Sequence, residues 1–311
     1  MSLPTVIATS VVRGSEQGQS HGGIFLVDLE TGTADQVFDW NNGEIDFTGR
    51  GADRGLRGIA FAGDDIYVAA SDEIFVFDTD FNIKESFRNR YLKHCHEIWM
   101  DGHLLYLTST GYNCILTFDI EHKFFNWGLV LAPGPKGLRV RTFDPRQDGP
   151  VPDASLHLNS VYKDNNGLFV AGMKCPAMIY FDGRDVRTLG KLPVGTHNAR
   201  PFGEGLLFND TAADRVRYVT DSDHIAFTVP RYPDDEIINE FDDTTKIARQ
   251  AFGRGLSPIS DGLVAAGSSP STISVHDIGG DRSLRDGQTI KSVNFSMDIR
   301  NAVHGLEVWP F

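Results

Sequence analysis

The chain repeats a unit of short apolar strands joined by polar turns. The clearest copy is residues 96–119, HEIWMDGHLLYLTSTGYNCILTFD, in which apolar runs are separated by an Asp-Gly turn and by the polar loop 110–113. Apolar or alternating runs of this length predict β-strands, and Gly, Asn and Asp favour the turns between them. We therefore expect three short consecutive strands here.

Five further segments resemble this unit, and each reaches an aspartate at the close of a β-rich run. They are residues 4–28 (with a longer loop), 65–79, 167–182, 205–221 and 262–277. Repetition at about 40–50 residues with about four strands per unit is typical of a β-propeller. We predict an all-β fold, a six-bladed β-propeller in a single domain over residues 1–311.

The two ends of the chain are predicted to meet in one blade. The first hairpin begins with a strand at Thr5–Val12 and has no inner strand before it, whereas the chain ends with HGLEVWPF. This ending resembles the inner-strand openings HEIWM and HLNSV. We expect His304–Pro310 to complete the first blade, which would leave no free sheet edge at the seam.

Histidine and arginine recur at the first position of the predicted inner strands. Around the ring these positions are His304, Arg57, His96, His157, His197 and Arg254. Inner strands line the central channel of a propeller, so their starts converge near one mouth of it. The chain has ten histidines, and four imidazoles around one axis suit a divalent transition metal. We predict that the four histidines bind such a metal, with zinc favoured and iron or manganese as alternatives.

Two other interpretations of the histidines stay open. A repeated histidine can serve only to hydrogen-bond a neighbouring turn in each blade, and the same residues can form a polar site without metal. Two of the six positions hold arginine instead of histidine, which favours the metal site. A histidine that only hydrogen-bonded a turn would be expected in all six blades. Four neighbouring residues are candidates to orient the ligands or, alternatively, to cap turns: Glu97, Asn159, Asn198 and Glu307.

Arginine and tyrosine supply the remaining candidate chemistry. Arg57 and Arg254 flank His304 in the predicted ring order, and two guanidinium groups near a metal would hold a substrate carboxylate or phosphate. The alternative for both is an ion pair with a nearby acid such as Asp53 or Asp261. Tyr112 is the candidate for proton transfer.

Two long insertions interrupt the repeats. Residues 129–156 form a connector predicted to be irregular, and it carries the basic residues Lys136, Arg139, Arg141 and Arg146. It is a candidate lid over the channel mouth, or else a solvated charged loop. The second insertion, residues 230–253, is predicted to include a short helix around Asp242–Ala251.

Composition narrows the classes of partner and compartment. A net charge of −13 argues against nucleic acid or an anionic membrane surface as the main partner. No apolar run is long enough to span a bilayer, and no signal peptide is evident. Three cysteines, Cys95, Cys114 and Cys175, form no CxxC pair. We expect buried free thiols and a cytoplasmic protein.

The chain resembles an uncharacterised family of bacterial conserved hypothetical propeller proteins. Its members have a similar histidine strand with an N-T-x-x-S-C-L-type hairpin, then H-L-N-G and P-H-S-P-R strands. The matching segments here are 109–115 (STGYNCI), 157–160 (HLNS) and 197–200 (HNAR), with Ser160 in place of Gly and Asn198-Ala199 in place of Ser-Pro. This resemblance covers about two-thirds of the chain and implies the propeller and the histidine site, but no activity.

Two groups of six-bladed propeller enzymes offer an analogy for the site. A calcium-dependent lactonase and esterase group uses carboxylate and amide ligands, which suit a harder cation than imidazoles do. A peptide-amidating lyase of similar shape places three histidines around zinc with an arginine and a tyrosine nearby. That arrangement is similar to His96, His157 and His197 with Arg57 and Tyr112.

Together these observations predict a metal-dependent lyase or hydrolase that acts on a small anionic substrate. An Fe(II) oxygenase with four histidine ligands is the second candidate, and a propeller scaffold that binds other proteins is the third. The metal content of the purified protein distinguishes them, because zinc favours the first, iron the second and no metal the third. The sequence names neither the substrate nor the oligomeric state.

Overall fold

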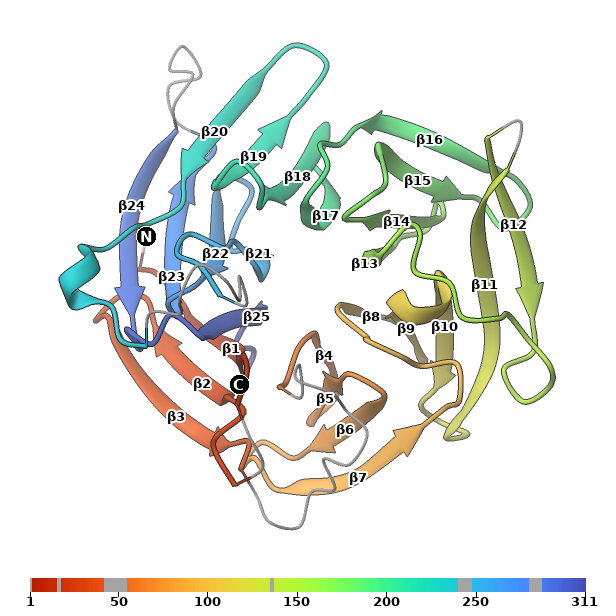
Figure 1. Cartoon of the computed structure of the whole chain (residues 1–311), viewed down its shortest axis with the longest axis horizontal. Coiled ribbons are helices and arrows are strands. Elements are labelled where there is room, and N and C mark those ends of the chain that lie inside the picture. The colour runs from red at the N-terminus through yellow and green to blue at the C-terminus, as the bar shows by residue number, and fades with distance from the viewer. Residues whose placement is uncertain (1, 16–17, 42–54, 135–136, 240–247, 280–286) are drawn as a thin grey trace. The chain divides into compact units, whose positions relative to one another are not determined.

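The strands of this protein form a six-bladed β-propeller, as the repeats predict (Figure 1). The computed structural model describes residues 2–15, 18–41, 55–134, 137–239, 248–279 and 287–311. Within these residues lie six antiparallel sheets, five of four strands and one of five. The chain divides into two compact units. We call residues 1–57 with 203–311 the terminal unit and residues 58–202 the central unit. A single domain over 1–311 stays a prediction.

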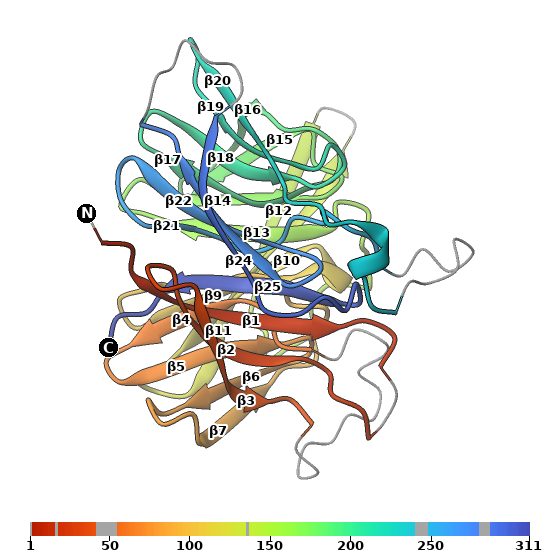
Figure 2. The ribbon, with the colours of Figure 1, turned by 90° about the vertical axis from the view of Figure 1, so that its left-hand side faces the viewer.

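The first blade, in the terminal unit, joins both ends of the chain. Its strands, in spatial order, are β25 (Asn301–Val308), β1 (Thr5–Val12), β2 (Gly23–Asp28) and β3 (Thr33–Asp39). The blue β25 lies beside the red β1 in Figure 2, paired from Val6 with Val308 to Val12 with Asn301. The predicted seam strand is confirmed, with different bounds: β25 begins three residues before His304 and ends two residues before Pro310.

The rest of the terminal unit consists of the sixth blade and three strands of the fifth. The sixth blade contains β21 (Leu256–Pro258), β22 (Leu263–Ser268), β23 (Thr272–Asp277) and β24 (Gln288–Asn294), and the other strands are β18 (Gly205–Asp210), β19 (Arg215–Val219) and β20 (His224–Thr228). A one-turn 3₁₀ helix, η2, spans Asp234–Glu236. Of the predicted helix at Asp242–Ala251, residues 242–247 lie outside the described residues, and 248–251 are not helical.

The central unit contains the second, third and fourth blades and the strand β17 (Thr196–Phe202). The second blade is β4 (Ile59–Ala62), β5 (Asp65–Ala70), β6 (Glu73–Phe77) and β7 (Ile83–Arg88). The third is β8 (Ile98–Asp101), β9 (Leu104–Ser109), β10 (Cys114–Asp119), β11 (Phe124–Gly134) and β12 (Gly137–Phe143), with the 3₁₀ turn η1 (Thr110–Tyr112). The fourth is β13 (Leu158–Lys163), β14 (Leu168–Gly172), β15 (Ala177–Phe181) and β16 (Val186–Lys191).

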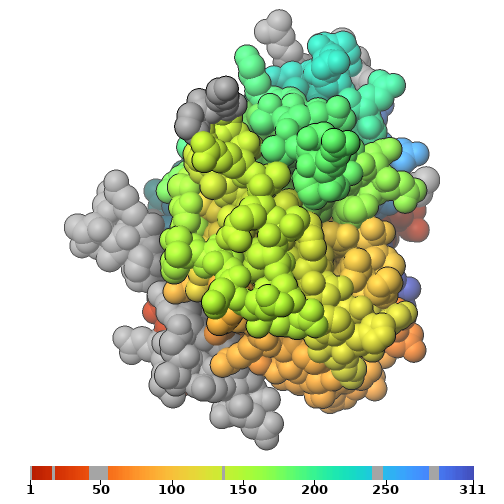
Figure 3. All heavy atoms as spheres, turned by 90° about the vertical axis from the view of Figure 1, so that its right-hand side faces the viewer, coloured from red at the N-terminus to blue at the C-terminus, as the bar shows by residue number. Residues whose placement is uncertain are grey.

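The basic connector after residue 129 is a hairpin rather than the predicted irregular lid. Strand β11 runs through Gly134, and β12 returns along it as the outer edge of the third blade. Leu138 and Val140 pack against the core, whereas Arg139 and Arg141 are exposed. This alternation is a strand signal that the basic composition obscured. Figure 3 shows the face on which the yellow third blade adjoins the green fourth blade.

The repeated aspartates that end the hairpin strands form turns. Oδ1 of Asp119 accepts from the backbone N–H groups of Glu121 (3.1 Å) and His122 (2.9 Å). Asp28 and Asp182 make the same kind of turn. These N–H donors lower the pKa of all three carboxyl groups. The repeat signature therefore reflects local turn chemistry.

Candidate functional site

Three of the predicted ligands, His96, His157 and His197, lie close together in the central unit. The ring centroids of His96 and His157 are 5.6 Å apart, and those of His96 and His197 are 6.4 Å apart. Each histidine lies at or next to the start of the first strand of its repeat: His96 precedes β8, His157 precedes β13 and His197 lies in β17. The repeat-equivalent placement noticed in the sequence thus brings these three imidazoles together.

The backbone around His96 is fixed by one threonine hydroxyl. Oγ1 of Thr108 accepts from the N–H groups of His96 (3.0 Å) and Glu97 (3.1 Å) and lies 3.0 Å from the Glu97 carbonyl oxygen, to which it donates. The His96 carbonyl accepts from the Gly58 N–H at 2.8 Å. A Cβ atom at Gly58 would lie 2.8 Å from that carbonyl oxygen, so only glycine allows this approach.

His157 has a left-handed backbone conformation, with φ of +51°. This region costs a residue other than glycine about 1 kcal/mol or more, and such strain gathers at functional sites. The His157 carbonyl accepts from the Met173 N–H at 3.1 Å, and a Cβ atom at Gly172 would lie 2.7 Å from the same oxygen. The neighbouring hairpin therefore holds His157 in this conformation.

The tautomer of His197 follows from its contact with a carbonyl. Nδ1 of His197 lies 3.0 Å from the carbonyl oxygen of Gly195, which can only accept. Nδ1 therefore carries a proton, so a neutral His197 ring would have its lone pair on Nε2. A backbone carbonyl on one ring nitrogen is the usual way to orient a metal-binding histidine. The side chain is 2% exposed.

The donor chemistry of the three histidines fits a transition metal, although the rings are spaced somewhat too widely. Zinc holds imidazole nitrogen at about 2.0–2.1 Å in a tetrahedral site, which places two ligand ring centroids about 5 Å apart. Both measured separations are longer. Among the described residues, no three His, Cys, Asp or Glu side chains already surround a common ion position. Metal binding would require the rings to move closer together.

Two of the predicted orienting residues form a pair in the central unit. Nδ2 of Asn198 donates to Oε1 of Glu97 at 2.5 Å, and each residue is adjacent in sequence to one of the histidines. Asn159 has a different partner, because its Nδ2 donates to the Thr196 carbonyl at 2.9 Å and so ties β13 to β17. Asn159 therefore links two strands, whereas Glu97 and Asn198 pair with each other. That these residues orient the histidine ligands stays a prediction.

The other predicted site residues, His304, Arg57 and Arg254, belong to the terminal unit. His304 is 7% exposed within β25, and Arg57 is 1% exposed. The guanidinium carbon of Arg254 lies 4.8 Å from the centre of the Phe252 ring, which Arg13 and Arg249 also approach, at 4.3 Å and 5.2 Å. That these residues join the three histidines stays a prediction.

Glu307 and Tyr112 make contacts within their own units. Oε2 of Glu307 accepts from the Ser257 hydroxyl at 3.0 Å in the terminal unit. The Tyr112 ring packs edge-on against Tyr91, with centroids 5.4 Å apart, and against the core of the central unit. Its role in proton transfer stays a prediction.

Sequence reasoning missed the groups that fix the histidines. The Gly195 carbonyl, the Thr108 hydroxyl and the Met173 N–H are backbone groups or common side chains, and no spacing rule singles them out. The arginines around Phe252 were also missed as a group, because Arg13 is distant in sequence from the other two.

Comparison with known proteins supports the fold alone. No family model and no curated protein matches the chain. A chain of a nidogen/laminin complex is 11% identical, with 97% of each chain covered and a TM-score of 0.59. The C-terminal WD40 domain of Sif2 is 11% identical over 96% of this chain and 90% of its own, with a TM-score of 0.51. A virginiamycin B lyase from Staphylococcus aureus (12% identity, 81% and 73% covered) has a TM-score of 0.46, too low for any functional comparison.

Proposed function

We propose that this protein is a metal-dependent lyase or hydrolase that acts on a small anionic molecule, with a divalent transition metal bound by His96, His157 and His197. The observation that supports this most is that the His96 ring lies near both others, with its centroid 5.6 Å from that of His157 and 6.4 Å from that of His197. The tautomer of His197, which leaves the lone pair on Nε2, suits the same purpose.

Zinc is the favoured metal because the donors are neutral nitrogens, and iron and manganese are the alternatives. When bound, such an ion supplies Lewis acidity, which polarises a substrate oxygen or lowers the pKa of water. Glu97, held by Asn198, would keep a carboxylate beside His96. His304 would serve as fourth ligand or as acid and base, and Tyr112 would transfer a proton.

The anionic substrate class rests on Arg57 and Arg254. Both are more than nine-tenths buried, and a buried guanidinium that receives a carboxylate or phosphate forms strong, directional hydrogen bonds.

In the described residues no helix is both long and apolar enough to cross a membrane. The three cysteines are free and buried, which confirms the expected thiols and supports a cytoplasmic location as part of the proposal.

Metal analysis of the purified protein tests the proposal. We expect about one transition-metal ion per chain in protein produced with ample metal, and a loss of most of it in His157→Ala and His197→Ala. His103→Ala is the matched control, because His103 is an exposed histidine in a turn of the same unit. Absence of metal in the wild-type protein, or equal metal content in all four proteins, would exclude the proposed site.

A thermal-shift measurement tests the substrate class separately. Phosphate and small carboxylates at millimolar concentration should raise the melting temperature of the wild-type protein, since a ligand that binds only the folded state stabilises it. Arg57→Lys and Arg254→Lys keep the charge but lose the two-pronged geometry, and should reduce the shift. Arg184→Lys, in an exposed turn, should not. If no anion stabilises the wild-type protein, the substrate class is wrong.

A further inference from the structure

A cavity in the central unit lies at the opposite end of the strands from the histidines. It has a volume of about 340 Å³, within the usual range for small-molecule sites. His157 precedes β13, whereas Lys163, which lines the cavity, ends it. Six residues of strand span about 20 Å. The cavity is therefore separate from the candidate metal site.

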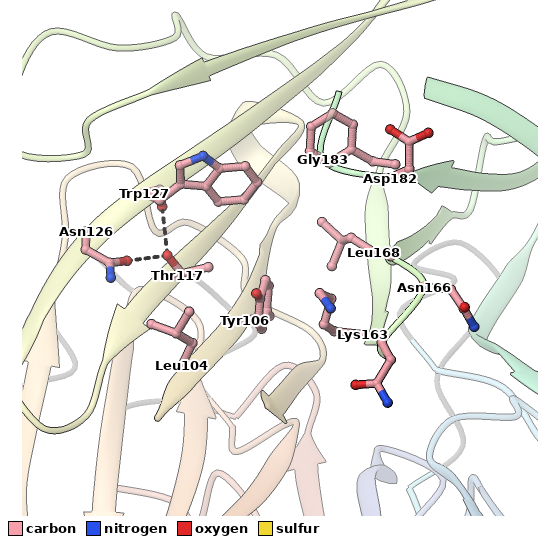
Figure 4. Close-up of a pocket in the computed structure, with 13 residues that line it drawn as sticks. Leu104, Tyr106, Thr117, Asn126, Trp127, Lys163, Asn166, Leu168, Asp182 and Gly183 are labelled. Atoms are coloured by element: carbon pink, nitrogen blue, oxygen red, sulfur yellow. Dashed lines mark hydrogen bonds between the residues drawn. The ribbon is translucent and has the colours of Figure 1, made fainter. Parts of the chain in front are cut away.

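The third and fourth blades each contribute one side of this cavity (Figure 4). Tyr106 and Trp127 come from the third blade, and Leu168 and Phe181 from the fourth. The Trp127 and Phe181 rings are inclined by 27°, with centroids 6.4 Å apart. The lining thus offers broad aromatic faces, which favour a ligand that has an apolar face of its own.

The polar atoms of the lining include both donors and acceptors. Oδ1 of Asn126 accepts from the Thr117 hydroxyl, so its Nδ2 remains a donor. Nδ2 of Asn166 donates to Asp164 at 3.2 Å, so its Oδ1 remains an acceptor. Burial raises the pKa of Tyr106, so the phenol keeps its proton. Its hydroxyl can therefore donate a hydrogen bond to a ligand.

The charges of the lining cancel. Lys163 and Asp182 are its two charged side chains. Nζ of Lys163 lies 3.5 Å from a carboxylate oxygen of Asp101, and Asp182 Oδ1 accepts from two backbone N–H groups of its own turn. The cavity therefore offers an anion little net electrostatic attraction. A purely apolar ligand would leave the amides and the phenol without hydrogen bonds, which costs about 1–3 kcal/mol for each buried group.

We propose that this cavity binds a neutral pyranose sugar, stacked on Trp127. A pyranose has a C–H face for the aromatic rings and a rim of hydroxyl groups. Each hydroxyl both donates and accepts, which matches the Asn126 and Tyr106 donors and the Asn166 and Asp182 acceptors. The proposal is independent of the metal and of the reaction at the histidines.

Tryptophan fluorescence tests this proposal with glucose, galactose, mannose, N-acetylglucosamine and their β-1,4-linked disaccharides as probes. We expect saturable binding of at least one probe, and a loss of about tenfold or more in affinity for Trp127→Ala, checked by calorimetry. Asn126→Ala, which leaves the aromatic faces in place, should lose about fivefold, and Trp127→Phe should bind within about threefold of wild type.

Two controls separate this cavity from the candidate metal site. His197→Ala should bind the sugar as the wild-type protein does, whether or not it has lost metal. Trp99→Phe should also bind normally, because Trp99 packs against Tyr162 outside the cavity lining. If no probe binds saturably, or if Trp127→Ala and Asn126→Ala both bind like the wild-type protein, the proposal is overturned.

Discussion

Asn198 donates its side-chain amide to the carboxylate of Glu97 across 101 residues of sequence, at a distance of 2.5 Å. The contact joins β17 to the segment that enters β8, and so spans the fourth blade inside the central unit. Asn198 also has a left-handed backbone, with φ of +54°. Asparagine is one of the few residues that tolerates this conformation.

A double-mutant cycle should show that this pair is coupled. Glu97→Ala and Asn198→Gly each remove one partner, and glycine keeps the left-handed backbone without strain. We expect a coupling free energy of about 1.5–3 kcal/mol in urea unfolding, since a hydrogen bond to a charged group contributes that much. Asn198→Ala should be less stable than Asn198→Gly by about 1 kcal/mol, because alanine is strained at this φ. Strictly additive single variants would show that the contact contributes nothing.

Much of the fold could be predicted because it repeats. An apolar run like Leu104–Ser109 and an aspartate like Asp119 recur in every hairpin, and each copy reinforces the interpretation of the others. The basic hairpin at β12 could not be recognised from the repeat, because it is an addition to one blade. The alternation of apolar Leu138 and Val140 with basic Arg139 and Arg141 was the sequence signal that indicates this strand.

The histidines could be predicted to converge, but not what holds them. Equivalent positions in a closed repeat fold meet in space, so the repeat alignment alone brings His96, His157 and His197 together. The orientation of His197 depends on the Gly195 carbonyl. A backbone oxygen two residues away has no signature in residue types, so the sequence does not reveal the tautomer.

The buried His276 should make the protein less stable in acid. Burial lowers its pKa from 6.5 to about 3 in the folded state. The unfolded chain therefore binds more protons than the folded one between about pH 3 and 6.5, and the free energy of unfolding falls as pH falls through this window. At pH 4.5 the loss from this group is about 2–3 kcal/mol.

His276→Gln isolates this contribution from that of the carboxyl groups. Glutamine can still hydrogen-bond the hydroxyl of Ser274 or Thr289, which flank the imidazole at 2.9 Å and 3.0 Å. Urea unfolding at pH 7 and pH 4.5 should show a smaller loss of stability in the variant than in the wild-type protein. The exposed His103→Gln should change nothing. An identical acid loss in all three proteins would show that His276 is not responsible.

The three thiols should be inert in the folded protein. All are buried, and burial raises the pKa of Cys114 and of Cys175 to about 12. Because the thiolate is the reactive form, alkylation at pH 8 should be very slow until the chain unfolds. Mass spectrometry after iodoacetamide treatment should find no label in the native protein and three labels in urea. Rapid labelling of a native thiol would contradict the burial.

Removal of the C-terminal strand should disable the protein. A chain that ends at Arg300 lacks the partner of β1 from Val6 to Val12. It also loses Ala302, Val303 and Leu306, which are at most 3% exposed. Burial of a valine or leucine side chain contributes about 1.5–3 kcal/mol, against a typical total stability of about 5–15 kcal/mol. The exposed edge of β1 would also invite association.

We therefore expect the truncated chain to be insoluble, or to melt far below the full-length protein in scanning calorimetry. Removal of Phe311 alone is the matched control, because that residue is 48% exposed and lies beyond β25. Chain ends that do not pack usually tolerate trimming, so the control should melt within a few degrees of the full chain. If the chain ending at Arg300 also melts there, β25 does not hold the first blade together. The burial of His304, which depends on the pairing of β25 in this blade, would then also be in error.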